Sequence, residues 1–434
     1  MENLPNKWPL TQTTFYKLLR DQGGYHTMSV GKDDLYQNDA KFHAFPGSTY
    51  PPVSWDLGFS DMKRSASKTR CLKEVANYDL FRRHLENTFV TTSENKTFWG
   101  KAIYEDCFHG KMDQGSQCIA ETFIDTLYPD DFVRDEALEI LKAKPEDKPW
   151  YLQVNFPGPH PPIFVTSEMA SSVHKRKWPD PADSVIAQHW SCPEYGGNPE
   201  FGGRCNYGAE LERLDNLMKS IVDQVTLEDT MVCITGDHGE MLGDHNLGGK
   251  KVPWQPSISV PLLCMGAGIQ VGKTYGDPVT TLDLPGTFME VAGVEKAEKM
   301  TTQSLVPALT TPSQPLTRQT VHSGLDEWRA VIRSINGVSW KLVCCIGKCQ
   351  SAPTGTPEPS KGWSLLLYDT EADPDDMISL HWENPNIVAT LRQDLPRGWC
   401  PNTNGVTAKP PPLSASTGAP QQKVPITAEQ KEAA

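Results

Sequence analysis

The sequence has no apolar run that approaches the roughly 20 residues needed to cross a membrane. Its first residues, MENLPNKWPLTQTTFYKLL, also lack the charged-then-apolar layout of a secretory signal. We therefore expect a soluble chain with no membrane span. The residues indicate neither a compartment nor an oligomeric state.

Positive charge is in short supply. The chain has 54 acidic and 41 basic residues, which gives a net charge of -13. A partner with a phosphate backbone is therefore disfavoured, and we expect no binding to nucleic acid. A small basic pocket for an anion is compatible with this overall charge.

Paired cysteines with the spacing of a zinc site are missing as well. The 11 cysteines are scattered, and Cys344, Cys345 and Cys349 form the one cluster among them. Reduced thiols and a few disulfides are both compatible with this distribution. The glycosylation sequon Asn95-Lys96-Thr97 fits a secreted protein, but such triplets arise by chance too often to decide.

What is present indicates a folded α/β chain. The share of hydrophobic residues is 38%, with 12 tryptophans, as in ordered proteins. Apolar periodicity predicts helices over 14–22, 131–141, 207–225 and 282–293, the last with Asp283 as its N-cap, and strands over 25–30, 150–156, 231–234 and 260–265. Because strands and helices alternate, we predict a doubly wound, mostly parallel sheet covered on both faces.

The chain changes character beyond about residue 310. Residues 331–335, 339–344 and 364–368 predict strands without a long helix between them, as in a small antiparallel sheet. Residues 401–434 are rich in Pro, Ser, Thr, Ala and Lys, which is typical of a disordered tail. We thus expect an α/β domain over 1–310, an antiparallel subdomain over 311–400 and a tail over 401–434.

The densest group of polar side chains lies between Thr230 and Leu263. An apolar run ends at Gly236, and Asp237, His238 and Glu240 follow at once. Open α/β sheets build their sites at the carboxyl ends of strands. A carboxylate next to an imidazole at such an end is suited to a divalent cation, although residues of these types also cap turns.

Three segments resemble the sulfatase family of the alkaline phosphatase-like superfamily. Residues 236–245, GDHGEMLGDH, with Lys250 and Val260-Pro261-Leu262 after them, are similar to its metal-binding segment. GGYHTMSVGK, ending at Lys32, resembles its second signature, but Asp33 and Asp34 stand where that signature has an aromatic residue and a His. His160, which is flanked by prolines after a strand, resembles the Pro-His-x-Pro stretch of the family.

The resemblance implies roles for five residues. Asp237 and His238 would be metal ligands, Lys32 and Lys250 would contact sulfate, and His160 would bind sulfate or protonate the leaving alcohol. The alternatives are solvated lysines and a histidine satisfied by a carbonyl group. For Asp244 and His245 we favour turn capping and supporting hydrogen bonds.

Asp34 has no family counterpart. A carboxylate facing an anionic substrate would repel it, so we expect Asp34 to bind a cationic group or a metal, or to point away.

The family's attacking group is not encoded in these residues. Sulfatases use a formylglycine made from the Cys or Ser of Cys/Ser-x-Pro/Ala-x-Arg, and none of the 11 cysteines or the serines begins that pattern. The first strand of the family, which ends in paired aspartates that complete the metal site, would also precede the first helix found here. We expect either a truncated sulfatase or a sulfatase-like protein without catalytic power.

The implied activity is hydrolysis of a sulfate ester to an alcohol and sulfate with a bound divalent cation. Calcium is the expected ion because the ligands are hard, while His238 would also suit a softer one. The expected substrate is a sulfated small molecule or carbohydrate. Two alternatives stay open: a non-catalytic protein that binds sulfated ligands, and a phosphatase or phosphodiesterase of the same superfamily.

Overall fold

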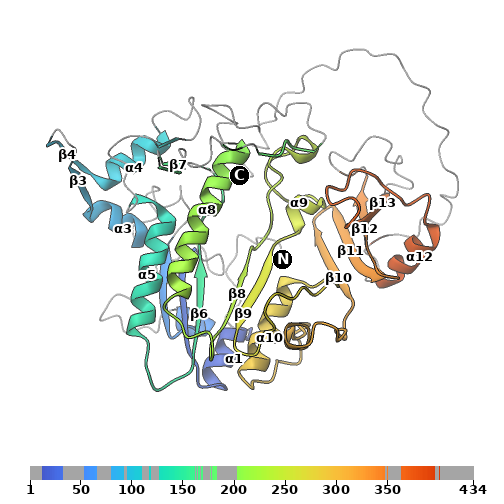
Figure 1. The fold of residues 1–434 in the computed structure, drawn as a ribbon, viewed down its shortest axis with the longest axis horizontal. Helices are drawn as coiled ribbons and strands as arrows, with labels where there is room; N and C mark the ends of the chain where they lie inside the picture. Colours follow the sequence, from blue (N-terminus) through green and yellow to red (C-terminus); the bar gives the residue numbers. More distant parts are fainter. Residues whose placement is uncertain are drawn as a thin grey trace, which may run out of the picture.

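A computed structural model gives the fold of the chain (Figure 1). It describes residues 12–32, 53–65, 80–91, 95–109, 117–118, 127–161, 163, 165–166, 168–169, 176, 178–182, 203–347, 349, 363–395 and 400. Asp33, Asp34 and the predicted tail over 401–434 lie outside these residues.

A parallel three-stranded sheet forms the centre of the larger domain. Its order is β2 (Asp61–Ser65), β1 (His26–Lys32) and β6 (Trp150–Asn155), and β1 pairs in parallel with both neighbours. The inner part of β1 is buried, as expected for a strand with a neighbour on each side and helices on its faces. The predicted parallel sheet is therefore confirmed, and β2 is a strand that the sequence analysis missed.

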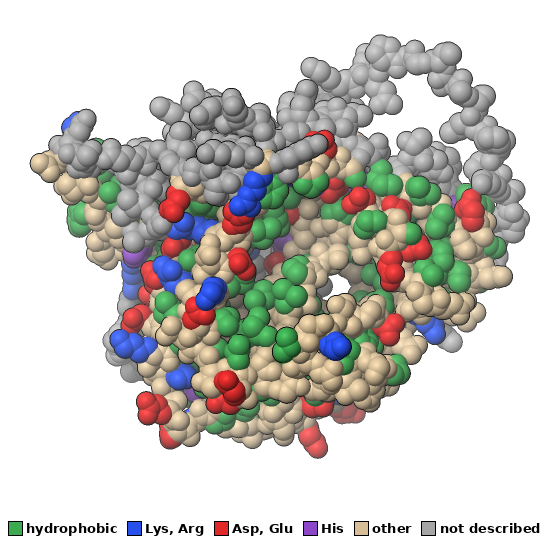
Figure 2. Space-filling view, in the orientation of Figure 1, with side chains coloured by type: hydrophobic (Ala, Val, Ile, Leu, Met, Phe, Trp, Pro, Cys, Tyr) green, Lys and Arg blue, Asp and Glu red, His purple; other side chains and the backbone are tan. Residues whose placement is uncertain are grey.

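Two helices cover one face of this sheet. They are α5 (Pro129–Ala143), with Pro129 in its first turn, and the long α8 (Gly203–Val222). Val133, Ala137 and Ile140 of α5 pack with sheet residues, and Ile221 of α8 joins them. The outer face of α8 carries charged side chains of both signs, such as the Lys219–Asp223 pair, and Figure 2 shows this mixture along the helix.

The other face of the sheet is covered by α1 (Phe15–Asp21) and α10 (Leu284–Val291). The Thr14 hydroxyl caps α1 by accepting a hydrogen bond from the Lys17 amide at 3.1 Å. Tyr151 of β6 packs against the rings of Phe15 and Phe288, with centroid distances of 5.6 and 5.4 Å. These aromatic contacts join the two helices to the parallel sheet.

The strand that leads into the polar cluster belongs to a separate pair. Strand β8 (Met231–Thr235) runs antiparallel to β9 (Leu262–Gly266), and Cys233 lies opposite Cys264, to which it is joined by a disulfide. Among the described residues β8 pairs with β9 alone, so the larger domain combines parallel and antiparallel pairing.

The carboxyl-terminal region is a four-stranded antiparallel sheet, shown in orange in Figure 1. Its order is β10 (Thr320–Leu325), β11 (Trp328–Ile335), β12 (Val338–Ile346) and β13 (Trp363–Asp369). The three predicted strands are thus found. The sequence analysis missed β10 and the helix α12 (Pro385–Asp394), whose Leu391 packs on one face of the sheet.

The remaining described elements are short. They are α2 (Val53–Leu57), α3 (Leu80–Asn87), β3 (Phe89–Thr91), β4 (Thr97–Trp99), α4 (Gly100–His109), β5 (Gln117–Cys118), β7 (Val165–Thr166), η6 (Asp244–Asn246), α9 (Gln255–Ile258), η7 (Thr281–Asp283) and α11 (Val306–Thr310). None of the helices in the described part of the chain has the length and apolarity that a membrane crossing needs.

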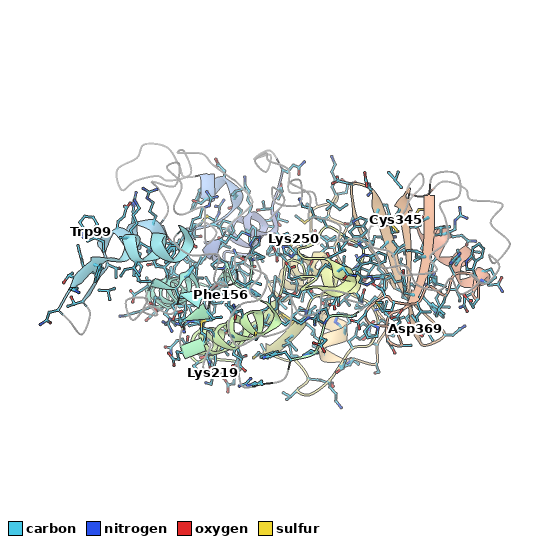
Figure 3. The ribbon with its side chains drawn as sticks, turned by 90° about the horizontal axis from the view of Figure 1, so that it is seen from above. Trp99, Phe156, Lys219, Lys250, Cys345 and Asp369 are labelled. Atoms are coloured by element: carbon cyan, nitrogen blue, oxygen red, sulfur yellow. A yellow bond between two sulfur atoms is a disulfide. The ribbon has the colours of Figure 1, made fainter. Side chains whose placement is uncertain are left out.

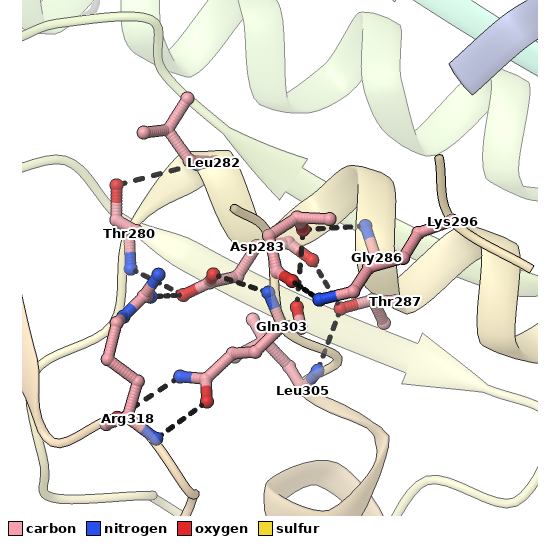
Figure 4. A network of polar contacts seen from close by, with 10 residues as sticks. Thr280, Leu282, Asp283, Gly286, Thr287, Lys296, Gln303, Leu305 and Arg318 are labelled. Carbon is pink, nitrogen blue, oxygen red and sulfur yellow. Dashed lines mark hydrogen bonds and ion pairs between the residues drawn. The ribbon is translucent and has the colours of Figure 1, made fainter. Parts of the chain in front are cut away.

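Asp283 stands at the predicted N-cap position of α10, but its side chain makes no capping hydrogen bond to that helix. Its fully buried carboxylate accepts hydrogen bonds from the amides of Thr280 and Gln303 at 3.3 and 3.2 Å and pairs with Arg318 (Figure 4). Thr280 is the residue that begins the helical segment, in a capping box with Asp283. Asp283 therefore ties α10 to the chain that leads into the antiparallel sheet.

Candidate anion and metal site

The candidate site residues follow three strands of the larger domain. Lys32 is the last residue of β1, His160 lies in the turn after β6, and Asp237 and His238 follow β8. Because β1 and β6 are parallel neighbours, their carboxyl ends meet at one edge of the sheet. Figure 3 shows Lys250 between the part of the larger domain that carries Phe156 and the antiparallel sheet that carries Cys345.

Asp237 and His238 form a compact pair. The Asp237 side chain is 77% exposed, and its Oδ2 atom lies 3.5 Å from Nε2 of His238. Nδ1 of His238 donates to the carbonyl of Gly239 at 2.8 Å, so Nε2 is the nitrogen that lies next to Asp237. The pair therefore brings one carboxylate and one imidazole nitrogen close together.

The surroundings of His238 lower its pKa. Burial lowers its pKa below the ordinary value, and the charges of Lys250 and Lys32 lower it further, against the opposing effect of Asp237. Both lysines thus act on the same imidazole, although one follows β1 and the other lies beyond β8. The structure brings Lys32, Lys250, Asp237 and His238 into one electrostatic environment.

The segment around Lys250 is fixed by Glu240. The Glu240 carboxylate accepts a hydrogen bond from the amide of Gly249, and the Gly249 carbonyl accepts one from the amide of Met241 at 2.9 Å. Burial raises the pKa of Glu240, while these amides and the charge of Lys250 oppose the rise. The two backbone groups of Gly249 are therefore both held immediately before Lys250.

Lys32 is placed by the close approach of β1 and β6. Gly31 has a φ of +96° and lies opposite Asn155, where an added Cβ would stand 2.0 Å from the Asn155 carbonyl oxygen. A side chain at this position would separate the strands. Gly31 therefore allows β1 to continue past Asn155 and deliver Lys32 at the edge of the sheet.

His160 is held in a turn that is anchored to α5. The amide of Gly158 donates to the buried carboxylate of Asp130 at 2.8 Å, and Nδ1 of His160 donates to the carbonyl of Pro161 at 2.6 Å. Nδ1 of His160 is therefore engaged within its own turn. Asp130 lies in the first turn of α5, where a carboxylate is favoured by the helix dipole.

Asp244 and His245 make structural contacts. Asp244 accepts a hydrogen bond from the amide of Ala182 at 2.7 Å and pairs with Arg204 at 2.5 Å. The His245 ring stacks on Trp254 at 4.8 Å and donates from Nε2 to the carbonyl of Asp375 at 2.7 Å. These contacts tie the loop to Ala182, Arg204, Trp254 and Asp375, in line with the supporting role expected for both residues.

Sequence reasoning missed Tyr207 at this site. Burial raises the pKa of Tyr207 well above its ordinary value, and the charges of Glu240, Glu210 and Asp237 add to the rise. Its ring packs with Ile163 and Leu242. No local pattern marks this tyrosine, because its neighbours at the site come from distant parts of the sequence.

The donor set of this site fits a divalent cation in part. Asp237 supplies an exposed carboxylate oxygen and His238 an imidazole nitrogen, and both are groups that bind metals. Within the described residues, no group of three or more His, Cys, Asp or Glu side chains is gathered as a metal site would gather them. The pair would therefore hold a cation together with further ligands.

The fold and the site together define a class of protein. A parallel sheet between helices carries Lys32 at its carboxyl edge, the separate β8–β9 pair leads into the Asp-His pair and Lys250, and a small antiparallel sheet follows. The Sulfatase family model matches residues 1–294, and the chain belongs to the sulfatase family.

Curated relatives carry the same family name. A choline-sulfatase of Rhizobium meliloti (strain 1021) is 24% identical over 331 residues, which cover 65% of this chain and 61% of that protein. Arylsulfatase K of Mus musculus is also 24% identical, over 60% of this chain and 52% of that protein. The match thus spans between half and two thirds of the length of these relatives.

Solved structures show the same fold. One protein, solved in complex with its substrate D-glucosamine-2-N,6-O-disulfate, superposes with a TM-score of 0.57 at 15% identity, over 91% of this chain and 83% of that one. The phosphonate monoester hydrolase of Silicibacter pomeroyi gives a TM-score of 0.58 at 16% identity, over 89% of this chain and 78% of that one. At these identities the likeness concerns the fold alone.

Proposed function

We propose that this chain provides the substrate-holding part of a sulfatase, an enzyme that hydrolyses R-O-sulfate to an alcohol and sulfate. The observation that carries the proposal is that the charges of Lys32 and Lys250 both lower the pKa of His238, the histidine that lies next to Asp237. Two ammonium groups would hold the oxygens of a sulfate ester and neutralise its charge. The substrate class we propose is a sulfated small molecule or carbohydrate.

His160 has the role of a proton donor in this proposal. Its Nδ1 atom donates to the Pro161 carbonyl, so the imidazolium form of His160 would carry at Nε2 the proton that the leaving alkoxide takes. The Asp130 bond to Gly158 fixes the turn that presents this ring. Asp237 and His238 would contribute two ligands to a divalent cation, with calcium as our first choice, and that ion would stabilise negative charge on the sulfate.

We further propose that turnover needs a nucleophile that these 434 residues do not encode. The absence of any Cys/Ser-x-Pro/Ala-x-Arg sequence supports this.

The strand pairing also supports a missing part of the sheet. Within the described residues β6 pairs only with β1, and β8 pairs only with β9. Every side chain of β6 is only half-buried, unlike the inner residues of β1, although strands inside a parallel sheet are normally covered on both faces. A further strand beside β6 would complete the sheet.

A turnover assay with an aryl sulfate such as 4-nitrophenyl sulfate tests the proposal. We expect no hydrolysis by this chain and hydrolysis by a longer product translated from further upstream in its gene. Hydrolysis by the short chain would overturn the need for another nucleophile. Failure of the longer product, combined with retained binding of inorganic sulfate, would instead indicate a non-catalytic protein that binds sulfated ligands.

A phosphorus ester is the second candidate substrate. The structural likeness to a phosphonate monoester hydrolase favours it, because that neighbour shares the fold over most of this chain. The same assay with 4-nitrophenyl phosphate and 4-nitrophenyl phenylphosphonate separates the two. Preference of the longer product for either phosphorus ester would replace the sulfatase proposal with this one.

A further inference from the structure

The segment that carries Lys250 is bound from outside by the antiparallel sheet. The indole N–H of Trp328, on β11, donates to the carbonyl of Lys251 at 2.8 Å. The ammonium group of Lys341, on β12, donates to the carbonyl of Pro253 and to Oε1 of Gln255, each at 3.1 Å. Side chains from two strands of the carboxyl-terminal sheet therefore hydrogen-bond to the segment immediately after Lys250.

Lys341 forms a fully buried ion pair with Asp376. Both side chains have 0% exposure, and the Asp376 carboxylate also accepts a hydrogen bond from the amide of Gln255 at 2.6 Å. Burial lowers the pKa of Lys341, and the charge of Asp376 opposes that effect. A buried pair of this kind adds little net stability compared with apolar side chains of similar volume. Its bonds to the 253–255 backbone suggest that it specifies a conformation.

That conformation is one the segment does not favour alone. Gly249 has a φ of +76° and Lys251 a φ of +77°, which for a lysine lies in the left-handed region. A non-glycine residue held there costs on the order of 1 kcal/mol, so the surrounding structure must determine it. The bond from Trp328 reaches the carbonyl of this same residue. Trp254, which has 0% exposure and stacks on His245, fixes the far end of the segment.

We propose that Lys341 and Asp376 are positioning residues for Lys250, and that Trp328 assists them. They act through residues 251–255, and the side chains of Lys341 and Asp376 are fully buried. The antiparallel subdomain thereby contributes to the anion site through the backbone that it holds. This inference rests on the proposed role of Lys250 as an anion contact.

The test uses variants that keep the fold. In the double variant Lys341→Met/Asp376→Leu, apolar side chains of similar size replace both charges, so that neither is left buried alone. Trp328→Phe removes one N–H and keeps an aromatic ring in the core. Trp340→Phe, on the opposite face of β12, is the matched control because its ring packs toward α12. Thermal unfolding checks that each variant is folded.

Two measurements are made on the full chain. Trypsin cleavage at Lys250 and Lys251 reports how often the segment opens, because cleavage of a transiently open site follows the open population. Titration with inorganic sulfate reports the affinity of the anion site. We expect the double variant and Trp328→Phe to be cleaved about tenfold faster and to bind sulfate about tenfold more weakly, which is the effect of losing one strong hydrogen bond. Trp340→Phe should match the wild type in both measurements.

The outcomes separate this inference from the proposed function. Unchanged cleavage in both the double variant and Trp328→Phe would overturn the inference whatever the sulfate data show. Faster cleavage with unchanged sulfate affinity, while Lys250→Ala weakens binding, would also overturn it, because the hold on the segment would then not matter for the anion. If the wild type and Lys250→Ala bind sulfate equally, the proposed role of Lys250 fails, and the inference fails with it even if cleavage is faster.

Discussion

Cys233 of β8 lies directly opposite Cys264 of β9, and the two side chains form a disulfide across the strand pair. Further disulfides join Cys344 to Cys400 and Cys345 to Cys349. Of the two possibilities that the sequence left open, the structure has the disulfides.

We expect the double substitution Cys233→Ser/Cys264→Ser to lower the free energy of unfolding by about 3 kcal/mol, because the cross-link restricts the unfolded chain. Chemical denaturation of the oxidised protein measures this. Peptide mapping without reductant is the companion experiment. Recovery of Cys233 and Cys264 as free thiols from the native protein would contradict the pairing.

Calcium should stabilise the chain through Asp237. A ligand that binds only the folded state at about 100 times its dissociation constant adds about 2.7 kcal/mol to the free energy of unfolding. We expect calcium to raise the melting temperature of the wild type, a chelator to reverse the rise, and Asp237→Asn to abolish it. Asp229→Asn, an exposed carboxylate before β8, serves as the control. An equal rise in Asp237→Asn would count against a metal role for Asp237.

Neighbouring lysines should differ sharply in their effect on sulfate binding. Lys250 acts on His238 and Glu240, whereas Lys251 is exposed. We expect Lys250→Ala to weaken sulfate binding at least about tenfold, which corresponds to about 1.4 kcal/mol. Lys251→Asn, which suits the left-handed backbone, should stay within about twofold. Isothermal titration calorimetry with sodium sulfate measures the affinity of both variants. A larger loss of affinity in Lys251→Asn than in Lys250→Ala would assign the anion contact to Lys251.

Removal of the Asp283 carboxylate should destabilise the larger domain. Asp283→Ala leaves Arg318 and two backbone amides without their buried acceptor, at an expected cost of about 3 kcal/mol in the free energy of unfolding. Glu290→Ala, an exposed change on α10, should cost less than about 0.5 kcal/mol. Urea denaturation of both variants compares them directly. If both variants lose a similarly small amount of unfolding free energy, the hydrogen-bond network in Figure 4 contributes little to stability.

The stability of the protein should fall in mild acid through His381. Burial lowers the pKa of this histidine from 6.5 to about 4, so the unfolded chain binds a proton in that range while the folded chain does not. Stability from this group is complete above pH 6.5 and is lost as the pH falls to about 4. Urea denaturation at several pH values should show a shallower decline for His381→Asn than for the wild type. Parallel declines would exclude His381 as the cause.

Local periodicity was sufficient to find the main strands and helices. Residues 25–30, 150–156 and 231–234 are strands because β-branched and aromatic residues are bounded there by turn residues. Strand β2 was missed because its sequence, DMKRS, is polar and it lies at the edge of the sheet. Its pairing with β1 depends on a partner from elsewhere in the chain.

The site was only partly accessible to sequence reasoning. Asp237, His238 and Lys250 stand in one continuous string, and their spacing is visible in the sequence. Tyr207 and Lys341 contribute through contacts with residues far from them along the chain, so no local pattern reveals them. The sequence placed Asp283 as a helix cap because it precedes the helix, whereas the side chain serves a tertiary network.

The two lysines stand on strand systems that do not pair with each other among the described residues. Lys32 ends the parallel sheet and Lys250 follows the β8–β9 pair, and α1 packed on α10 is one of the contacts that connect the two systems. An anion bound by both lysines would connect the parallel sheet to the β8–β9 pair. Anion affinity and the rigidity of the α1–α10 contact would then be linked. A substitution that loosens α1 against α10 would weaken anion binding although it lies outside the site, and a bound anion would make that contact more rigid.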